Sequence, residues 1–233
     1  MKHTSYLILT FLLFWSCNLY SQVFISQYIE TNSGSIPKGI EIYNASASDI
    51  DFAMNIMEIY RGSNGAACAP RITINNGILE SGKVWVIGTS NLTDYALNFG
   101  NELSGISSYS MSFNGDDALQ LFVGGVLMDV FGTCGIDPGN QWSGNGVSTK
   151  DQNIQTRSTI CSGTTSDWSD PSTRFEIVST DPVNNMTGFG NSPTGCSSGP
   201  TVPSAPTIAS IVNGENQVSV YFYPGADGGS PIT

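Results

Sequence analysis

Short runs of β-branched and aromatic residues, separated by turn residues, constrain the fold of this chain more than any other feature. Residues 23–29 (VFISQYI) are an example, and runs of this composition are typical of strands. Gly124-Gly125 joins two apolar runs by only two residues, which is a pattern typical of a β-hairpin. We therefore expect strands at residues 23–29, 40–43, 56–60, 72–74, 84–87, 118–123 and 126–131.

Evidence for helices is thin. Residues 92–99 could form a turn or two with Asn91 as the N-cap, but no longer window keeps a helical period. From residue 132 to 196 the regularity fades, and we expect long loops with closing strands near 154–160 and 175–179. Short strands with frequent turns predict an all-β fold, an antiparallel β-sandwich, for residues 22–196.

The N-terminus has the pattern of a secretory signal. Lys2 and His3 form a short positive region, and residues 6–15 are apolar except for Thr10. That run is shorter than the about 20 residues that span a bilayer. We expect cleavage after Ser21, which makes residues 1–21 a signal peptide; lipidation at Cys17 is the alternative, disfavoured by the aromatic residues before it. No later segment is long and apolar enough to form a transmembrane span.

Charge argues against one class of partner. Without Lys2 the chain keeps seven basic residues against 19 acidic residues, a net charge of −12. Such a chain repels phosphate backbones at long range, and its basic residues are scattered rather than clustered. We expect no nucleic acid among its partners.

Cysteine usage agrees with export. Removal of Cys17 leaves four cysteines without the Cys-x-x-Cys spacing of a metal site. An even number in an exported chain predicts two disulfides, with free thiols as the alternative. Four cysteines allow three pairings. We favour Cys134–Cys161 and Cys68–Cys196, because the first pair closes the shorter loop.

A domain boundary is expected near the C-terminus. Residues 197–206 are rich in proline and read as a linker. A strand pair is predicted at 207–212 and 217–223, joined by Asn213-Gly214. Two strands cannot cover their own apolar face, so residues 207–233 would be an incomplete second β-sandwich.

The first domain resembles the extracellular, bacterial-type lamin-tail domain. The matching segments are residues 25–30, 38–44, 49–52, 79–87, 113–119 and 129–132. They occur in the right order over about residues 23–190, with Gln27 where such domains generally carry Glu. The resemblance implies an immunoglobulin-like sandwich of a type commonly attached to secreted hydrolases and surface proteins.

The C-terminal piece resembles the start of a fibronectin type III domain. The resemblance is carried by residues 203–206, 217–222 and 227–233. It implies a second sandwich, of which this chain holds the opening strands.

The sequence disfavours several kinds of catalysis. The only histidine, His3, lies in the expected signal peptide. A mature chain without histidine has no triad with a histidine base, no histidine-ligated zinc site and no histidine-dependent nuclease centre. We therefore expect a protein that is not an enzyme.

Two sets of carboxylates are weak site candidates. Asp116 and Asp117 lie in a turn between strands, where they could bind a hard cation such as Ca²⁺. We favour the interpretation that Asn114-Gly115-Asp116 caps the turn and that Asp117 starts the next strand, and we expect no cofactor. Glu41 and Glu58 could form an acid–base pair as in glycoside hydrolysis. Alternation of Glu41 with Ile40 and Ile42 instead predicts that Glu41 faces solvent.

Two tryptophans are the weak candidates for ligand binding. Trp142 and Trp168 lie in the loop-rich region and could stack on a sugar, although plugging the edge of the sandwich is the favoured interpretation.

These features together predict a non-catalytic adhesion, targeting or scaffold module of a secreted or cell-surface protein, of bacterial type, with an unknown protein or glycan partner. One alternative is the accessory region of a secreted hydrolase whose catalytic domain lies beyond residue 233. Another is a Ca²⁺- or glycan-binding module.

Overall fold

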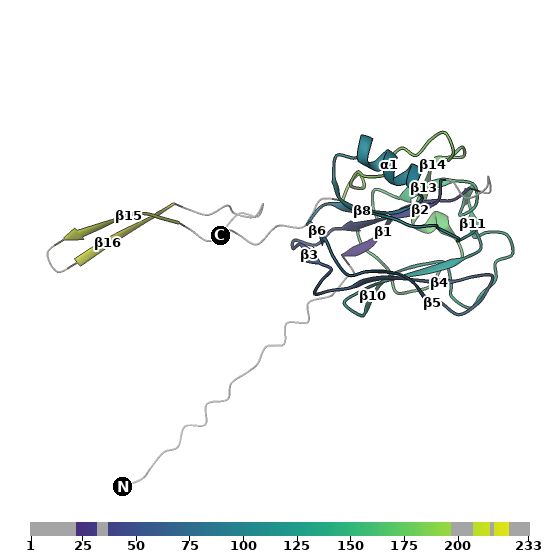
Figure 1. Cartoon of the computed structure of the whole chain (residues 1–233), viewed down its shortest axis with the longest axis horizontal. Coiled ribbons are helices and arrows are strands. Elements are labelled where there is room, and N and C mark those ends of the chain that lie inside the picture. The colour runs from purple at the N-terminus through teal and green to yellow at the C-terminus, as the bar shows by residue number, and fades with distance from the viewer. Residues whose placement is uncertain (1–21, 32–36, 197–206, 215–216, 224–233) are drawn as a thin grey trace, which may run out of the picture.

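The computed structural model describes residues 22–31, 37–196, 207–214 and 217–223. The expected signal peptide, 1–21, and the expected linker, 197–206, lie outside the described residues. Two stacked sheets form the body of the protein (Figure 1). The fold is an all-β sandwich, as predicted, with one short α-helix.

The larger sheet has six strands and supplies one wall of the core. In spatial order they are β14 (Phe175–Ser179), β13 (Asn153–Thr156), β1 (Val23–Ile29), β2 (Gly39–Asn44), β7 (Val84–Gly88) and β8 (Leu103–Ser108). All pairs are antiparallel except β7 and β8, which run parallel. The prediction of a fully antiparallel sheet is therefore wrong at this edge. Helix α1 (Ser90–Phe99) connects β7 to β8 and returns the chain to the starting end of β7, so that β8 runs in the same direction as β7.

The smaller sheet has four strands and closes the sandwich. In order they are β10 (Val126–Phe131), β9 (Ala118–Val123), β4 (Met57–Gly62) and β5 (Ala69–Ile74). Strands β9 and β10 form the predicted hairpin, in which Val123 pairs with Val126. Gly124 and Gly125 both adopt positive φ, a conformation that glycine reaches without strain.

Short elements connect the sheets. They are β3 (Ile50–Asp51) paired with β6 (Ile78–Leu79), β11 (Ser143–Gly144) paired with β12 (Val147–Ser148), and the 3₁₀ turn Pro171–Thr173. The predicted closing strand at 154–160 ends earlier, at Thr156, because the Ile160 amide turns back to the Arg157 carbonyl. The predicted helix begins at Ser90 with Thr89, not Asn91, as its N-cap.

The main core lies between the two sheets. Tyr28, Phe131 and Phe175 are fully buried there, and the Tyr28 and Phe131 rings stack with centroids 4.4 Å apart. A second apolar layer covers the outer face of the six-stranded sheet, where Leu92 and Ala96 of α1 and Phe189 pack on Ile29 and Val86. Every residue of β1, β2 and β7 is therefore buried, on both faces.

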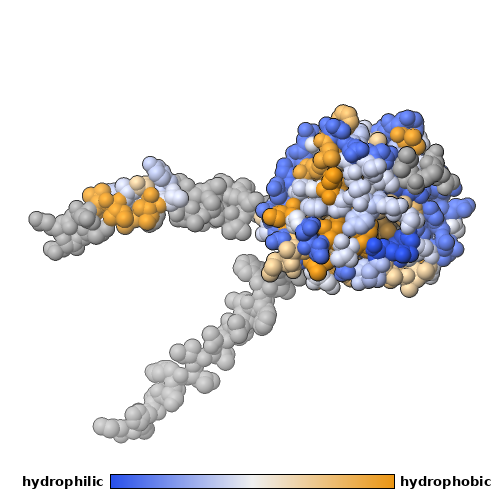
Figure 2. All heavy atoms as spheres, viewed as in Figure 1, coloured by the Kyte–Doolittle hydropathy of each residue, from blue (hydrophilic) through white to orange (hydrophobic). Residues whose placement is uncertain are grey.

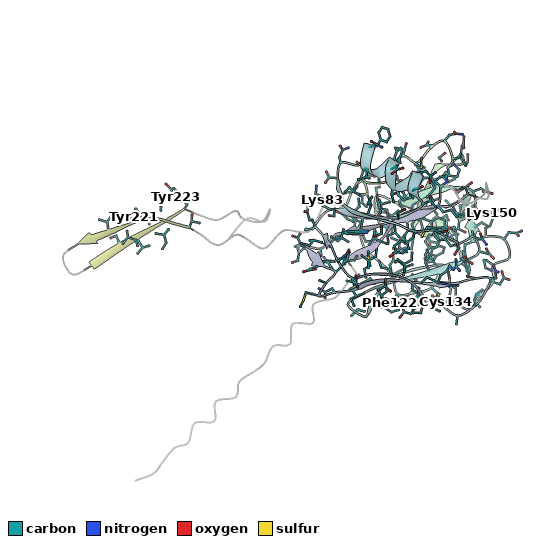
Figure 3. All side chains as sticks on the ribbon, in the orientation of Figure 1. Lys83, Phe122, Cys134, Lys150, Tyr221 and Tyr223 are labelled. Atoms are coloured by element: carbon teal, nitrogen blue, oxygen red, sulfur yellow. A yellow bond between two sulfur atoms is a disulfide. The ribbon has the colours of Figure 1, made fainter. Side chains whose placement is uncertain are left out.

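The C-terminal described part is a two-stranded hairpin. Strands β15 (Thr207–Gly214) and β16 (Gln217–Tyr223) pair through Gly214 and Gln217, so Asn213-Gly214 ends a strand instead of joining the two. Apolar side chains on it are exposed, as the orange surface in Figure 2 and the labelled Tyr221 and Tyr223 in Figure 3 show. An incomplete second sandwich stays a prediction.

In the part of the chain that the structure describes, no helix has both the length and the apolar character needed to cross a membrane.

Candidate functional sites

The four cysteines among the described residues form two disulfides, Cys68–Cys134 and Cys161–Cys196. The prediction of disulfides is confirmed, but the predicted pairing, Cys134–Cys161 and Cys68–Cys196, is wrong. The length of the closed loop was the wrong criterion, because the pairing of the strands determines which cysteine-bearing loops lie side by side.

The first disulfide joins loops at one end of the four-stranded sheet. Gly62, at the end of β4, pairs with Ala118, and Leu119 pairs with Phe131 at the end of β10. The loops that follow β4 and β10 therefore leave the sheet at the same end, and they carry Cys68 and Cys134.

The second disulfide fastens the chain to the outer face of the six-stranded sheet. Cys196 packs there against Phe24, Tyr43 and Val84, and the Tyr43 hydroxyl donates to the Cys196 carbonyl at 3.1 Å. Cys161 follows β13 in the same sheet. This bond holds the covering segment in place.

Asp117 is a structural turn residue in this arrangement. Its buried carboxylate accepts the backbone amides of Asn114 at 3.0 Å and Asn64 at 3.3 Å, and Arg61 Nε lies 3.8 Å away. Burial raises the pKa of Asp117, while these hydrogen bonds and the Arg61 charge oppose the shift. These contacts tie Asp117 to the turn, and β9 begins at the next residue, Ala118, instead of at Asp117 as predicted.

Asp116 lies beside a polar cavity of about 250 Å³ that Glu30, Asn114 and Lys150 also line. The Glu30 carboxylate is already paired with the Lys38 ammonium, 2.9 Å away. Among the described residues, no three His, Cys, Asp or Glu side chains gather in a way that could hold a metal ion.

The two tryptophans pack inward. Trp142 is buried, so the prediction that it could stack on a sugar is wrong; its ring meets that of Trp168 edge-on at 6.4 Å. Trp168 is partly buried, packs edge-on against Phe131 and donates its Nε1 to the Val130 carbonyl at 3.1 Å. Both rings therefore plug the core where the loop-rich region covers it.

Glu41 and Glu58 do not form a pair. Glu58 lies on β4 between the core residues Met57 and Ile59, so it points to the outer face of the four-stranded sheet. Glu41 lies on β2 and points to the outer face of the other sheet. The structure thus separates the two carboxylates by the whole sandwich.

The prediction that Glu41 faces solvent is also wrong. Its side chain is only 1% exposed, because the segment around Phe189 and Gly190 covers this face. The Ser26 hydroxyl donates to Glu41 Oε1 at 2.7 Å, and the Gly190 amide donates to Oε2 at 2.7 Å. Burial raises the pKa of Glu41 to about 8, even though these hydrogen bonds favour the charged form.

The raised pKa of Glu41 predicts a pH dependence of stability. In the unfolded chain Glu41 ionises near 4.5, but in the folded chain it keeps its proton until about 8. The contribution of Glu41 to the free energy of unfolding should therefore be greatest below pH 4.5, and it should decrease as the pH rises toward 8. Glu41→Gln, which mimics the neutral acid, should remove the decline and be more stable than wild type above pH 8.

Denaturant titrations between pH 6 and 8 emphasise this effect, because burial raises the pKa of Asp129 only to about 6 and residues 22–233 contain no histidine. Glu58→Gln, on the opposite outer face, is the matched control and should keep the wild-type slope. An equal decline in wild type and Glu41→Gln would show that Glu41 does not cause it.

Asp129 is a buried residue that sequence reasoning missed. Its carboxylate accepts the amides of Ile25 at 2.9 Å and Thr164 at 2.8 Å, and Arg174 Nη2 lies 3.5 Å away. It therefore ties β10 to β1 and to the loop after β13. The feature of the sequence that could have indicated its burial is that Asp129 is the one charged residue within the apolar run of residues 126–131.

A cavity near these groups has a volume of about 770 Å³, within the range typical of ligand pockets. Val23, Ile50 and Met128 give it apolar walls, and Thr164 and Arg174 add polar groups. No prediction from the sequence pointed to it, because its walls come from five separate segments.

No family model matches this chain, and neither any curated protein nor any solved structure shows significant similarity to it.

Proposed function

We propose that this chain is an exported, non-catalytic scaffold or adhesion module whose rigid sandwich presents binding surfaces outside the cell. The observation that carries the proposal is that three buried carboxylates hold parts of the fold together. Glu41, Asp117 and Asp129 each accept backbone amides from a second segment, so each joins elements of the fold. Hydrogen bonds of this kind support a structural role for these three carboxylates.

Two further features support export and an extracellular role. The disulfides suit an oxidising compartment, and the N-terminal pattern is that of a signal peptide. The resemblance to a bacterial-type lamin-tail domain followed by the start of a fibronectin type III domain fits a multi-domain surface protein. A place beside the catalytic domain of a secreted hydrolase is the alternative on the same observations.

Activity assays on the purified full chain test the proposal. We expect no hydrolysis of nucleic acid, ester or glycoside substrates. Turnover that disappears in Glu41→Gln or Asp129→Asn but persists in Glu58→Gln would identify an enzyme instead.

Binding assays test the remaining alternative. On a glycan array, binding that a chelator and the Asp116→Ala/Asp117→Ala variant both abolish would favour a Ca²⁺-dependent glycan module. Binding that persists with the chelator and in the double variant would support adhesion that does not require a metal ion.

A further inference from the structure

Three side chains with complementary chemistry meet where the two sheets face each other near Asn114. Lys38 lies directly before β2, and its Nζ is 2.9 Å from Glu30 Oε1. The same nitrogen is 2.9 Å from the Phe113 carbonyl and 3.4 Å from Asn114 Oδ1. The Lys38 and Glu30 side chains are only 8% and 1% exposed. A buried amine therefore touches both a carboxylate and a side-chain amide.

The Asn114 amide is held in place by its own backbone. The Asn114 N–H donates to Asp117 at 3.0 Å, its carbonyl accepts the Asp117 amide at 3.1 Å, and the Tyr28 hydroxyl reaches the same carbonyl at 3.4 Å. The carbon that a nucleophile would attack, Cγ, is bonded directly to the Oδ1 that Lys38 contacts. Reacting atoms are typically held about 3 to 3.5 Å apart. The 3.4 Å contact joins Nζ to Oδ1, so Nζ must shift from Oδ1 toward the adjacent Cγ for the attack.

An apolar wall stands beside the cluster, because Tyr28 stacks on Phe113 at 5.0 Å and on Phe131 at 4.4 Å. Glu30 Oε1 lies 2.9 Å from Lys38 Nζ, within reach to take a proton from the ammonium and leave a neutral amine. A neutral lysine amine is a competent nucleophile.

The geometry points to an intramolecular isopeptide bond between Lys38 Nζ and Asn114 Cγ, with Glu30 as the proton acceptor and donor. The Lys38 ammonium gives a proton to Glu30, and the neutral amine attacks Asn114 Cγ to form the new C–N bond. The Cγ–Nδ2 bond then breaks as Glu30 returns that proton to the leaving nitrogen. The attacking nitrogen gives its extra proton to the departing ammonia, which leaves as an ammonium ion. One lysine ammonium and one amide become one secondary amide and one ammonium ion, with no oxidant or reductant.

The ammonia released by this reaction has a cavity through which it can leave, and the new bond would connect the two sheets. The polar cavity of about 250 Å³ beside Glu30 and Asn114 gives the released ammonia a place to leave. Lys38 directly precedes β2 of the six-stranded sheet, and Asn114 precedes β9 of the four-stranded sheet. Among the described residues, each disulfide links segments that belong to one sheet, so the isopeptide bond would be the covalent link between the two sheets.

Mass spectrometry of the full chain tests this inference. We expect the intact protein to be lighter, by the mass of one ammonia molecule, than its disulfide-bonded sequence. Tryptic digestion should give a branched peptide joining Lys38 to Asn114, with no cleavage after Lys38. Lys38→Arg, which keeps the charge beside Glu30 but is not a nucleophile, and Glu30→Gln should both restore the full mass.

Lys150→Arg is the matched control, because Lys150 lines the same cavity and stands at the surface at this end of the sandwich (Figure 3); it should keep the mass loss. Asn114-Gly115 can also lose ammonia by succinimide formation. A mass loss that persists in Lys38→Arg, or an intact mass equal to that of the uncross-linked chain in wild type, would overturn the proposal.

Discussion

Replacing Cys161 and Cys196 together with serine should lower the free energy of unfolding by about 2 to 5 kcal/mol. The bond spans 35 residues, so its loss frees the unfolded chain. It also releases Cys196 from its packing against Phe24 and Tyr43, which loosens the segment that buries Glu41. Denaturant unfolding of the oxidised proteins measures the loss.

The single variants give this experiment its control. If Cys161 pairs with Cys196, either single Cys→Ser change breaks the same bond and should cost nearly as much as both together. If each cysteine pairs with another partner, the double variant breaks two bonds and its cost should be close to the sum. An additive result would contradict the observed pairing.

Phe131→Ala should lower the free energy of unfolding by about 3 to 5 kcal/mol. Phe131 is fully buried, and its ring contacts Tyr28, Trp168 and Phe175 with centroids 4.4, 5.0 and 5.4 Å away. Removal leaves a cavity between the sheets that three rigid rings cannot easily fill. Urea unfolding followed by tryptophan fluorescence measures the change.

Phe99→Ala is the matched control, because Phe99 in α1 is 62% exposed. A surface change of this kind should stay within about 0.5 kcal/mol. Equal losses in the two variants would mean that Phe131 is not at the centre of the core.

The strands of the sandwich were readable because β-branched and aromatic runs are local signals. Residues 84–87 and 118–123 fall inside β7 and β9. Strand β8 escaped because Leu103–Ser108 holds three serines and a glycine, is only half-buried, and pairs in parallel with β7 at the sheet edge. The parallel pairing depends on the short helix between β7 and β8. The sequence pattern of either strand alone does not indicate this pairing.

The burial of Glu41 shows a limit of alternation. Alternation separates the two faces of β2, but it does not say what covers the face that is not in the core. The cover comes from α1 and from residues 186–196, which have no periodic pattern of their own. The pairing of Glu30 with Lys38 was hidden for a similar reason, since neither residue forms a motif until β1 and β2 pair.

The disulfide pattern of the protein purified from its export compartment tests the central claim, an exported sandwich braced by two disulfides, most directly. Peptide mapping without reduction should find Cys68 linked to Cys134 and Cys161 linked to Cys196, on a chain that begins at Gln22. Four free thiols, or a chain kept inside the cell with residues 1–21 still attached, would contradict the account.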